Sequence, residues 1–178
     1  MSFKSIIYEA ISYATAYFNQ SSLNTFRIST LLLNGKFSVC TSMMRFGSSG
    51  SVVDNVGAGG GCVGVNNDGS LMPFGFNKAG QRIAEWNGKK FAGYVIPHFS
   101  DVLGMARKAH LDCPLCSFVG WDFAINQDGK VNLIEANLES PGLFFEQLAN
   151  GKPAFGDRTA EVADWVCNHP LPLWPMYN

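Results

Sequence analysis

The sequence lacks an excess of charge of either sign. It has 13 basic and 14 acidic side chains, a net charge of -1, and charged residues make up only 15% of the chain. Such a chain creates no overall electrostatic field that would attract a polyanion. We therefore expect neither nucleic acid nor an anionic membrane surface among its partners, and any recognition of charge has to be local.

A long apolar run is also missing. The apolar segment near the N-terminus is interrupted by Glu9 and is too short and too polar to cross a bilayer. No small-residue cleavage pattern follows it, so it does not resemble a signal peptide. These features predict a protein without a membrane span or secretory leader.

Cysteine is sparse, with five residues in 178. An odd, dilute set is not a secreted disulfide framework and favours a reducing compartment, so we expect a cytoplasmic protein. Cys113 and Cys116 form a C-x-x-C pair, which occurs in redox and zinc sites. No second such pair accompanies it, and two partly buried thiols are the favoured interpretation.

Hydrophobic residues make up 47% of the chain, enough for one core, so residues 1–178 are interpreted as a single domain. Apolar periodicity predicts helices over 5–18, 98–111, 143–149 and 159–167. Alternating segments separated by turn residues predict hairpins over 23–46, 62–76 and 117–137, the first turning at Asn34-Gly35. This order predicts an α+β fold, an antiparallel sheet with helices on one face.

The third hairpin carries the candidate chemistry. A two-residue turn at Asp128-Gly129 would place Asp122 directly opposite Glu135, with Asn137 on the same face opposite Gly120. Carboxylates paired across strands have Cβ atoms about 4.5–5.5 Å apart and need a shared proton or a cation. The reverse face is mainly apolar and would pack on the helices.

Asp122, Glu135 and Asn137 offer only oxygen ligands, which suit Mg²⁺ or Mn²⁺ rather than zinc. Because magnesium in proteins commonly shares phosphate oxygens, a nucleotide phosphate is the expected remaining ligand. Two other interpretations stay open from spacing alone. The carboxylates could belong to a solvated surface hairpin, or they could act as the acid and nucleophile of a glycosidase.

The run WDFAINQDGKVNLIEANLESPGL resembles the terminal metal-binding motif of ATP-grasp enzymes. In that motif an Asp on one strand is followed by Glu-x-Asn on the next and often by a Ser-Pro-Gly turn. The positions that match are Asp122, Glu135, Asn137, Ser140, Pro141 and Gly142. The resemblance implies that Asp122, Glu135 and Asn137 bind magnesium that bridges the phosphates of ATP.

Two upstream segments extend this resemblance to residues 23–151. The run NTFRISTLLLNGKFSVCTSMMRFG resembles paired strands whose arginines, here Arg27 and Arg45, face the phosphates or the acyl intermediate. The run DNVGAGGG resembles the family's asparagine-then-glycine loop, here Asn55 followed by Gly57, Gly59, Gly60 and Gly61. A turn-forming role for Asn55 and a simple connector role for the glycines remain alternatives. A regular Asn34-Gly35 register would put the two arginines on different faces unless a bulge intervenes.

The closest resemblance is to sugar-transfer-associated or α-L-glutamate-ligase-related ATP-grasp proteins. It implies a ligase that activates a small carboxylate with ATP as an acyl phosphate and joins it to an amine or similar nucleophile. The chain matches the C-terminal half of the fold, and we expect the preceding subdomains to be absent. Three alternatives stay open: a truncated product that is inactive alone, a split half that needs a partner, or a remnant that binds metal or phosphate without turnover. The face that the missing half would cover is expected to favour self-association. The alternative is a non-enzymatic module that binds metal or phosphate, or that acts in assembly.

Overall fold

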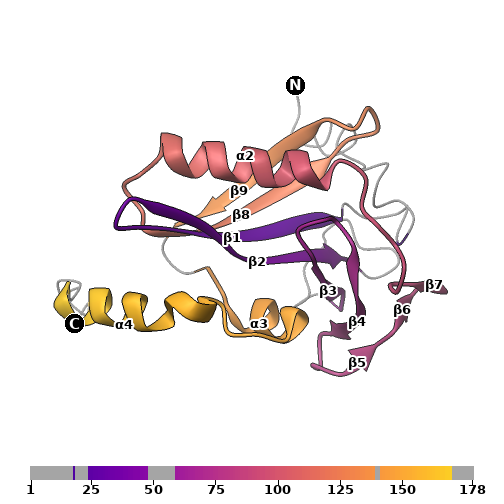
Figure 1. Ribbon diagram of the computed structural model, residues 1–178. Helices are drawn as coiled ribbons and strands as arrows, with labels where there is room; N and C mark the ends of the chain where they lie inside the picture. The colour runs from indigo at the N-terminus through magenta and orange to yellow at the C-terminus, as the bar shows by residue number, and fades with distance from the viewer. Residues whose placement is uncertain (1–17, 19–23, 48–58, 139–140, 170–178) are drawn as a thin grey trace, which may run out of the picture.

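The computed structural model describes residues 18, 24–47, 59–138 and 141–169, so the helix expected over 5–18 lies outside the described residues except for Phe18. Within the described residues one antiparallel sheet has the strand order β5-β4-β3-β2-β1-β8-β9 (Figure 1). The bounds of its strands are β1 Thr25–Leu33, β2 Lys36–Phe46, β3 Gly61–Val65, β4 Leu71–Asn77, β5 Arg82–Ile83, β8 Phe118–Ile125 and β9 Val131–Asn137. Strands β6 (Glu85–Trp86) and β7 (Lys89–Lys90) pair separately.

The first hairpin follows the sequence prediction closely. Asn34 and Gly35 both have positive φ, at 52° and 71°, which is the conformation of the tight primed turn. Leu33 pairs with Lys36 across it. The second predicted hairpin is also confirmed, since β3 and β4 pair around the turn at residues 66–70.

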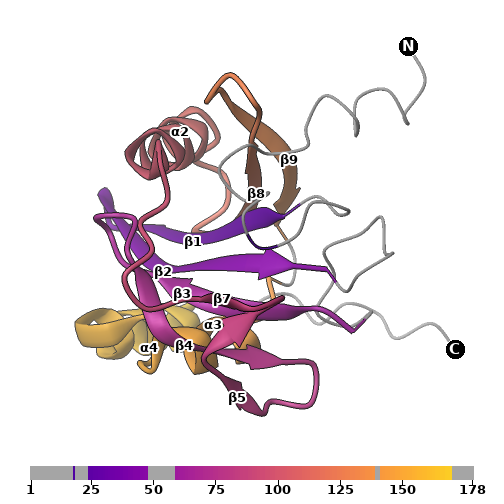
Figure 2. The same ribbon diagram turned by 90° about the vertical axis from the view of Figure 1, so that its right-hand side faces the viewer.

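Helices pack on both faces of the sheet (Figure 2). Helix α2 (Phe99–Asp112) covers one face, where Phe99, Val102 and Ala106 join the largest apolar cluster. Helices α3 (Phe144–Asn150) and α4 (Thr159–Asn168) lie on the other face, next to the 3-10 turn η2 (Gly156–Arg158). The α+β class and the antiparallel sheet are confirmed, while the helices occupy two faces rather than the one expected.

Adjacent residues of β2 show why two faces need cover. Met44 belongs to the cluster beneath α2, whereas Met43 packs with Cys62 and Ala149 on the α3 side. Since neighbouring strand residues point to opposite faces, the central strands are apolar on both. Leu31 and Leu33 extend the second face to α4, where Val162 and Trp165 meet them.

Arg158 fixes the start of α4 to the first hairpin. Its guanidinium donates to the carbonyl oxygens of Leu33 and Lys36 at 3.1 Å each, and also to Glu161 of the adjoining helix.

No helix in the described part of the chain is long and apolar enough to cross a membrane. Cys113 and Cys116 are free, half-buried thiols.

Candidate functional site

A bulge in the first hairpin brings Arg27 and Arg45 to the same face of the sheet. Near the turn Thr30 pairs with Val39, but beyond it Ser29 pairs with Thr41, so Cys40 is an extra residue in β2. This one-residue offset sets Arg45 opposite Thr25 and Arg27 opposite Met43. A bulge of this kind therefore cancels the opposite-face arrangement that a regular register would give.

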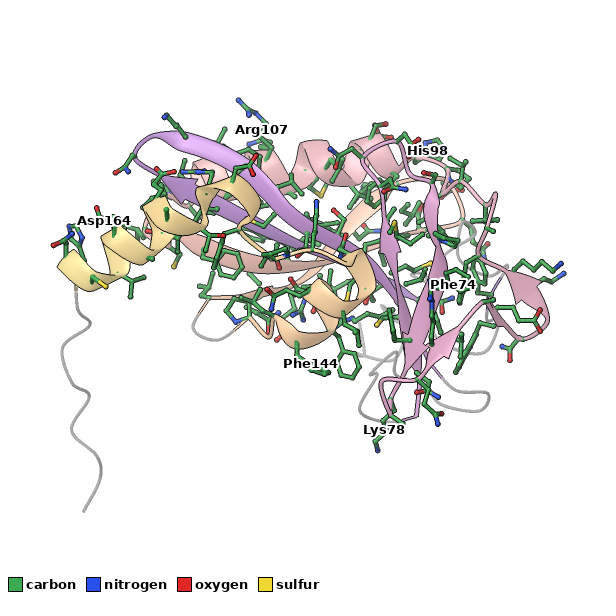
Figure 3. All side chains as sticks on the ribbon, turned by 60° about the horizontal axis from the view of Figure 1, so that its bottom comes forward. Phe74, Lys78, His98, Arg107, Phe144 and Asp164 are labelled. Carbon is green, nitrogen blue, oxygen red and sulfur yellow. The ribbon has the colours of Figure 1, made fainter. Side chains whose placement is uncertain are left out.

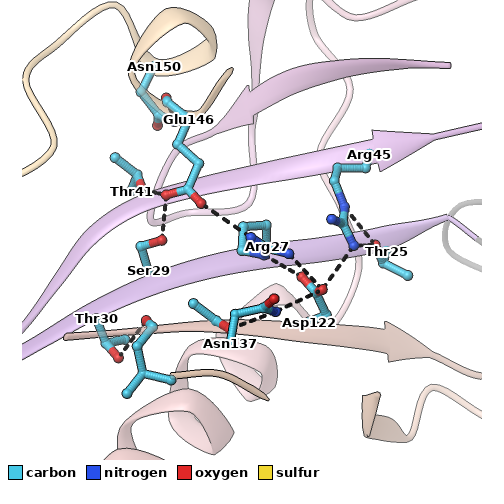
Figure 4. A network of polar contacts seen from close by, with 12 residues as sticks. Thr25, Arg27, Ser29, Thr30, Thr41, Arg45, Asp122, Asn137, Glu146 and Asn150 are labelled. Carbon is cyan, nitrogen blue, oxygen red and sulfur yellow. Dashed lines mark hydrogen bonds and ion pairs between the residues drawn. The ribbon is translucent and has the colours of Figure 1, made fainter. Parts of the chain in front are cut away.

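Asp122 is the centre of the polar network on this face (Figure 4). Arg27, its direct partner across β1 and β8, binds it in a bidentate pair, with Nε to Oδ1 at 2.5 Å and Nη2 to Oδ2 at 2.8 Å. Arg45 Nη2 lies 3.1 Å from Oδ2. Asp122 is only 2% exposed, so its charge is balanced by arginines instead of water.

The third hairpin reaches the predicted pairing by a different route. Asp122 does pair with Glu135, and Gly120 with Asn137, which confirms these two partnerships. The two-residue turn is wrong, because Asn126 and Lys130 close a wider loop in which Gly129 has a φ of 79°. The wider loop shifts the pairing of β8 with β9 by one residue, so that Phe123 pairs with Leu133. Ile134 is an extra residue in β9, and this bulge restores the predicted pairing from Asp122 and Glu135 onward.

Glu135 and Asn137 flank Asp122 at the outer edge of the sheet. The Glu135 side chain is exposed, and its carboxylate makes no hydrogen bond or ion pair with another described residue. Asn137 donates from Nδ2 to the Gly120 carbonyl oxygen at 3.3 Å and approaches Asp122 Oδ2 at 3.5 Å. The room expected above Gly120 is already filled, since an added Cβ would lie 2.8 Å from Pro141 Cβ and 3.4 Å from Arg27 Cδ.

Glu146 on α3 is a member of the network that the sequence interpretation missed. It is 0% exposed, and its Oε2 accepts hydrogen bonds from the hydroxyls of Ser29 and Thr41. Its Oε1 lies 3.7 Å from Arg27 Nη1. The sequence does contain one indication of Glu146, because it is a glutamate in the predicted helix directly after the Ser-Pro-Gly turn. Helix periodicity alone, however, does not predict that this side chain faces the sheet.

The electrostatics of this group are coupled. Burial lowers the pKa of Arg27, but hydrogen bonding to Asp122 and the charges of Asp122, Glu146 and Glu135 outweigh it, and the net shift is upward. Burial raises the pKa of Glu146, and the two hydroxyls and Arg27 oppose that rise only in part. Two cations and three carboxyl groups therefore share one face of the sheet.

The predicted glycine loop is described only from Gly59 onward; Asn55 and Gly57 lie outside the described residues. Gly59 has a φ of 98°, which favours glycine. Gly60 and Gly61 serve close packing, since a Cβ on Gly60 would lie 2.1 Å from the Phe46 carbonyl oxygen and one on Gly61 would lie 2.6 Å from its ring. Gly61 opens β3 rather than continuing the loop, so packing explains these two glycines.

A cavity of about 210 Å³ adjoins the network at Thr41. Its lining includes Ser42, Asn150 and Lys152. The buried Ser42 hydroxyl belongs to the opposite face of β2 from Thr41. The amide of Asn150 and the ammonium group of Lys152 beside this small cavity suit a carboxylate or another small anion.

The oxygen donors of the site suit a hard cation only in part. Among the described residues there is no group of three or more His, Cys, Asp or Glu side chains arranged to hold a metal. Asp122 and Glu135 lie opposite each other on neighbouring strands, and Asn137 adds an amide oxygen. Of the two carboxylates, only that of Glu135 has oxygens without a hydrogen-bond partner among the described residues. Such a set fits a magnesium ion that keeps water or phosphate oxygens as its other ligands, rather than an all-protein cage.

Comparison with known families identifies the family of this chain. The model of the sugar-transfer associated ATP-grasp family matches residues 6–163, which is most of the chain. The protein therefore belongs to the sugar-transfer associated ATP-grasp family, and the family implies ATP as its ligand. No curated protein matches the sequence.

Proposed function

We propose that this chain supplies the phosphate-binding and magnesium-binding residues of an ATP-dependent ligase reaction on a small carboxylate. The observation that carries the proposal is the convergence of Arg27, Arg45, Asp122, Glu135 and Asn137 on one face of the sheet. In a phosphoryl transfer most of the catalysis comes from positioning and from neutralising phosphate charge. Cations and oxygen ligands side by side supply both requirements.

The metal ligands of the proposal are Glu135, Asn137 and Asp122. Glu135 is the main ligand, because its carboxylate is exposed and forms no hydrogen bond or ion pair with the described residues. Asp122 contributes less while Arg27 and Arg45 occupy its oxygens. A bound magnesium ion would neutralise phosphate charge, and these three side chains would fix its place beside the sheet.

In the proposed reaction the substrate carboxylate displaces ADP from the γ-phosphorus of ATP to give an acyl phosphate. An amine or similar nucleophile then attacks the acyl carbon, and inorganic phosphate leaves. Arg45 would neutralise charge on the transferred group, and Arg27 would hold Asp122 in place. The cavity beside Thr41, with Lys152 at its wall, supports a small anionic substrate.

A thermal-shift titration with magnesium, ATP and both together tests the proposal. Both together should stabilise the chain by about 2.7 kcal/mol at a hundredfold excess over Kd. This corresponds to a rise in Tm of about 5–11 °C for a protein of this size. Each ligand alone should have much less effect, because the cation and the phosphates share ligands.

Glu135→Ala should reduce the magnesium-dependent affinity for ATP by about tenfold or more, the change that a loss of about 1.4 kcal/mol produces. The matched control is Glu85→Ala, which removes another exposed strand glutamate from β6, outside the network. Equal ATP affinity of the Glu135 and Glu85 variants would remove Glu135 from the site.

An assembly module is the second candidate, and the edge of the sheet favours it. Strand β9 is an edge strand, and Leu133, Ile134 and the following Leu138 are each about half exposed. Exposed apolar side chains along an unpaired edge are typical of association surfaces. In that case magnesium would raise Tm equally with and without ATP, and the protein would elute as an oligomer from a sizing column.

A further inference from the structure

Helix α3 exposes an aromatic side chain and buries a carboxyl group. Phe144 is 70% exposed (Figure 3), whereas Glu146, two residues later, is 0% exposed and lies against the sheet (Figure 4). Burying a carboxyl group and exposing a phenylalanine both cost free energy. Partners specific to Glu146 have to offset that cost.

Those partners come from two strands of the sheet. The hydroxyls of Ser29 on β1 and Thr41 on β2 both donate to Oε2 (Figure 4). Its other oxygen, Oε1, is buried and has no hydrogen bond from the described residues. The nearest cation is Arg27 Nη1 at 3.7 Å.

Arg27 is consequently held between two carboxyl groups. Its Nε and Nη2 edge binds Asp122, and its Nη1 corner points to Glu146. The residue is 8% exposed. An arginine with both sides facing buried acids has little capacity left to bind a phosphate, but it is well placed to fix the acid it touches.

We propose that Glu146 is a positioning residue, which holds Arg27 against Asp122 and thereby fixes Asp122 for the cation and phosphates. The inference rests on the proposed function and extends it to a residue of α3. Glu146 acts through its negative charge, and the two hydroxyls set the direction of its carboxylate. Arg27 then belongs to the support of the site, rather than to the groups that touch ATP.

Glu146→Gln is the direct test, because it keeps the size of the side chain and an oxygen for the two hydroxyls while removing the charge. The first readout is the Arg27 Nε–H resonance in ligand-free protein, assigned by its loss in Arg27→Lys. The second is the Kd for ATP with magnesium. We expect hydrogen exchange at Arg27 Nε–H to accelerate about tenfold and ATP affinity to fall about tenfold, the equivalents of a change of about 1.4 kcal/mol.

Glu161→Gln is the matched control. Glu161 also pairs with an arginine, Arg158, but on α4 and outside the network around Asp122. This variant should leave both the Arg27 resonance and the ATP affinity at wild-type values. Thr41→Val is a second test variant, because it removes one hydroxyl and keeps the charge of Glu146. It should accelerate exchange at Arg27 Nε–H and weaken ATP binding, both by less than Glu146→Gln does. This variant decides the question if Glu146→Gln fails to fold.

If Glu146 only fills space, Glu146→Gln should change neither the hydrogen exchange at Arg27 Nε–H nor the Kd for ATP. That result overturns the positioning role of Glu146, although the wild-type chain would still bind ATP. A wild-type chain that does not bind ATP overturns the proposed function instead. The Arg27 resonance still decides then whether Glu146 holds the arginine, because that measurement needs no ligand.

Discussion

Replacing Asp122 by Asn should destabilise the ligand-free protein far more than an ordinary charge change. The carboxylate is 2% exposed and accepts a bidentate pair from Arg27 and a further contact from Arg45. Removing one partner of a buried ion pair costs about 3–5 kcal/mol because the remaining charge is left uncompensated. We expect about 3 kcal/mol, the lower end of that range, since the amide oxygen can still accept one hydrogen bond.

Urea unfolding and calorimetry measure the effect. At about 2–4 °C per kcal/mol for a chain of this size, Tm should fall by about 6–12 °C. The loss should persist at about 1 M salt, because buried pairs are screened much less than exposed ones. The control is Asp128→Asn in the exposed turn of the same hairpin, which should change stability by about 0.5 kcal/mol at most. A loss in Asp122→Asn no larger than in this control would refute a buried, structurally coupled Asp122.

Two further variants test neighbouring features. Gly120→Ala places a Cβ 2.8 Å from Pro141 Cβ, so overpacking should cost about 1–3 kcal/mol in urea unfolding; an unchanged midpoint would contradict this contact. Hydrogen bonds from Arg158 and Asn34 lower the pKa of Glu161 from 4.5 to about 2. Because the pKa of Glu161 is lower in the folded protein than in the unfolded chain, its carboxylate stabilises the fold at pH values above the unfolded-state pKa. This stabilisation is lost as the pH falls through the folded-state pKa, so Tm should decline between pH 4.5 and 2. Glu161→Gln should flatten that decline, and an identical profile in both proteins would exclude the contribution.

Local signals in the sequence were sufficient for most elements. Asn-Gly between two alternating segments identified the first hairpin, because both residues adopt positive φ readily and strand twist favours that turn. Apolar periodicity identified α2, α3 and α4 within one or two residues of their ends. The partnership of Asp122 with Glu135 was also predicted, although the turn assumed for it was too short.

The misses concern tertiary context. Helices cover both faces because Met43 and Met44 are both apolar, and a sequence pattern does not say which helix meets which face. The inward orientation of Glu146 depends on Ser29 and Thr41, which are more than 100 residues away in the chain. Helix propensity contains no information about such a distant hydroxyl pair, so the residue could be found only in three dimensions.

Bulges are the decisive feature that links sequence to site. Cys40 in β2 and Ile134 in β9 are each one residue more than their partner strands accommodate. If the strands paired regularly through these two residues instead of bulging, Arg45 would lie opposite Asn24, on the other face from Arg27, and Glu135 would lie opposite Trp121, on the other face from Asp122. Since a shift of one residue turns every side chain beyond it to the other face, the same two insertions align the apolar core and the charged cluster.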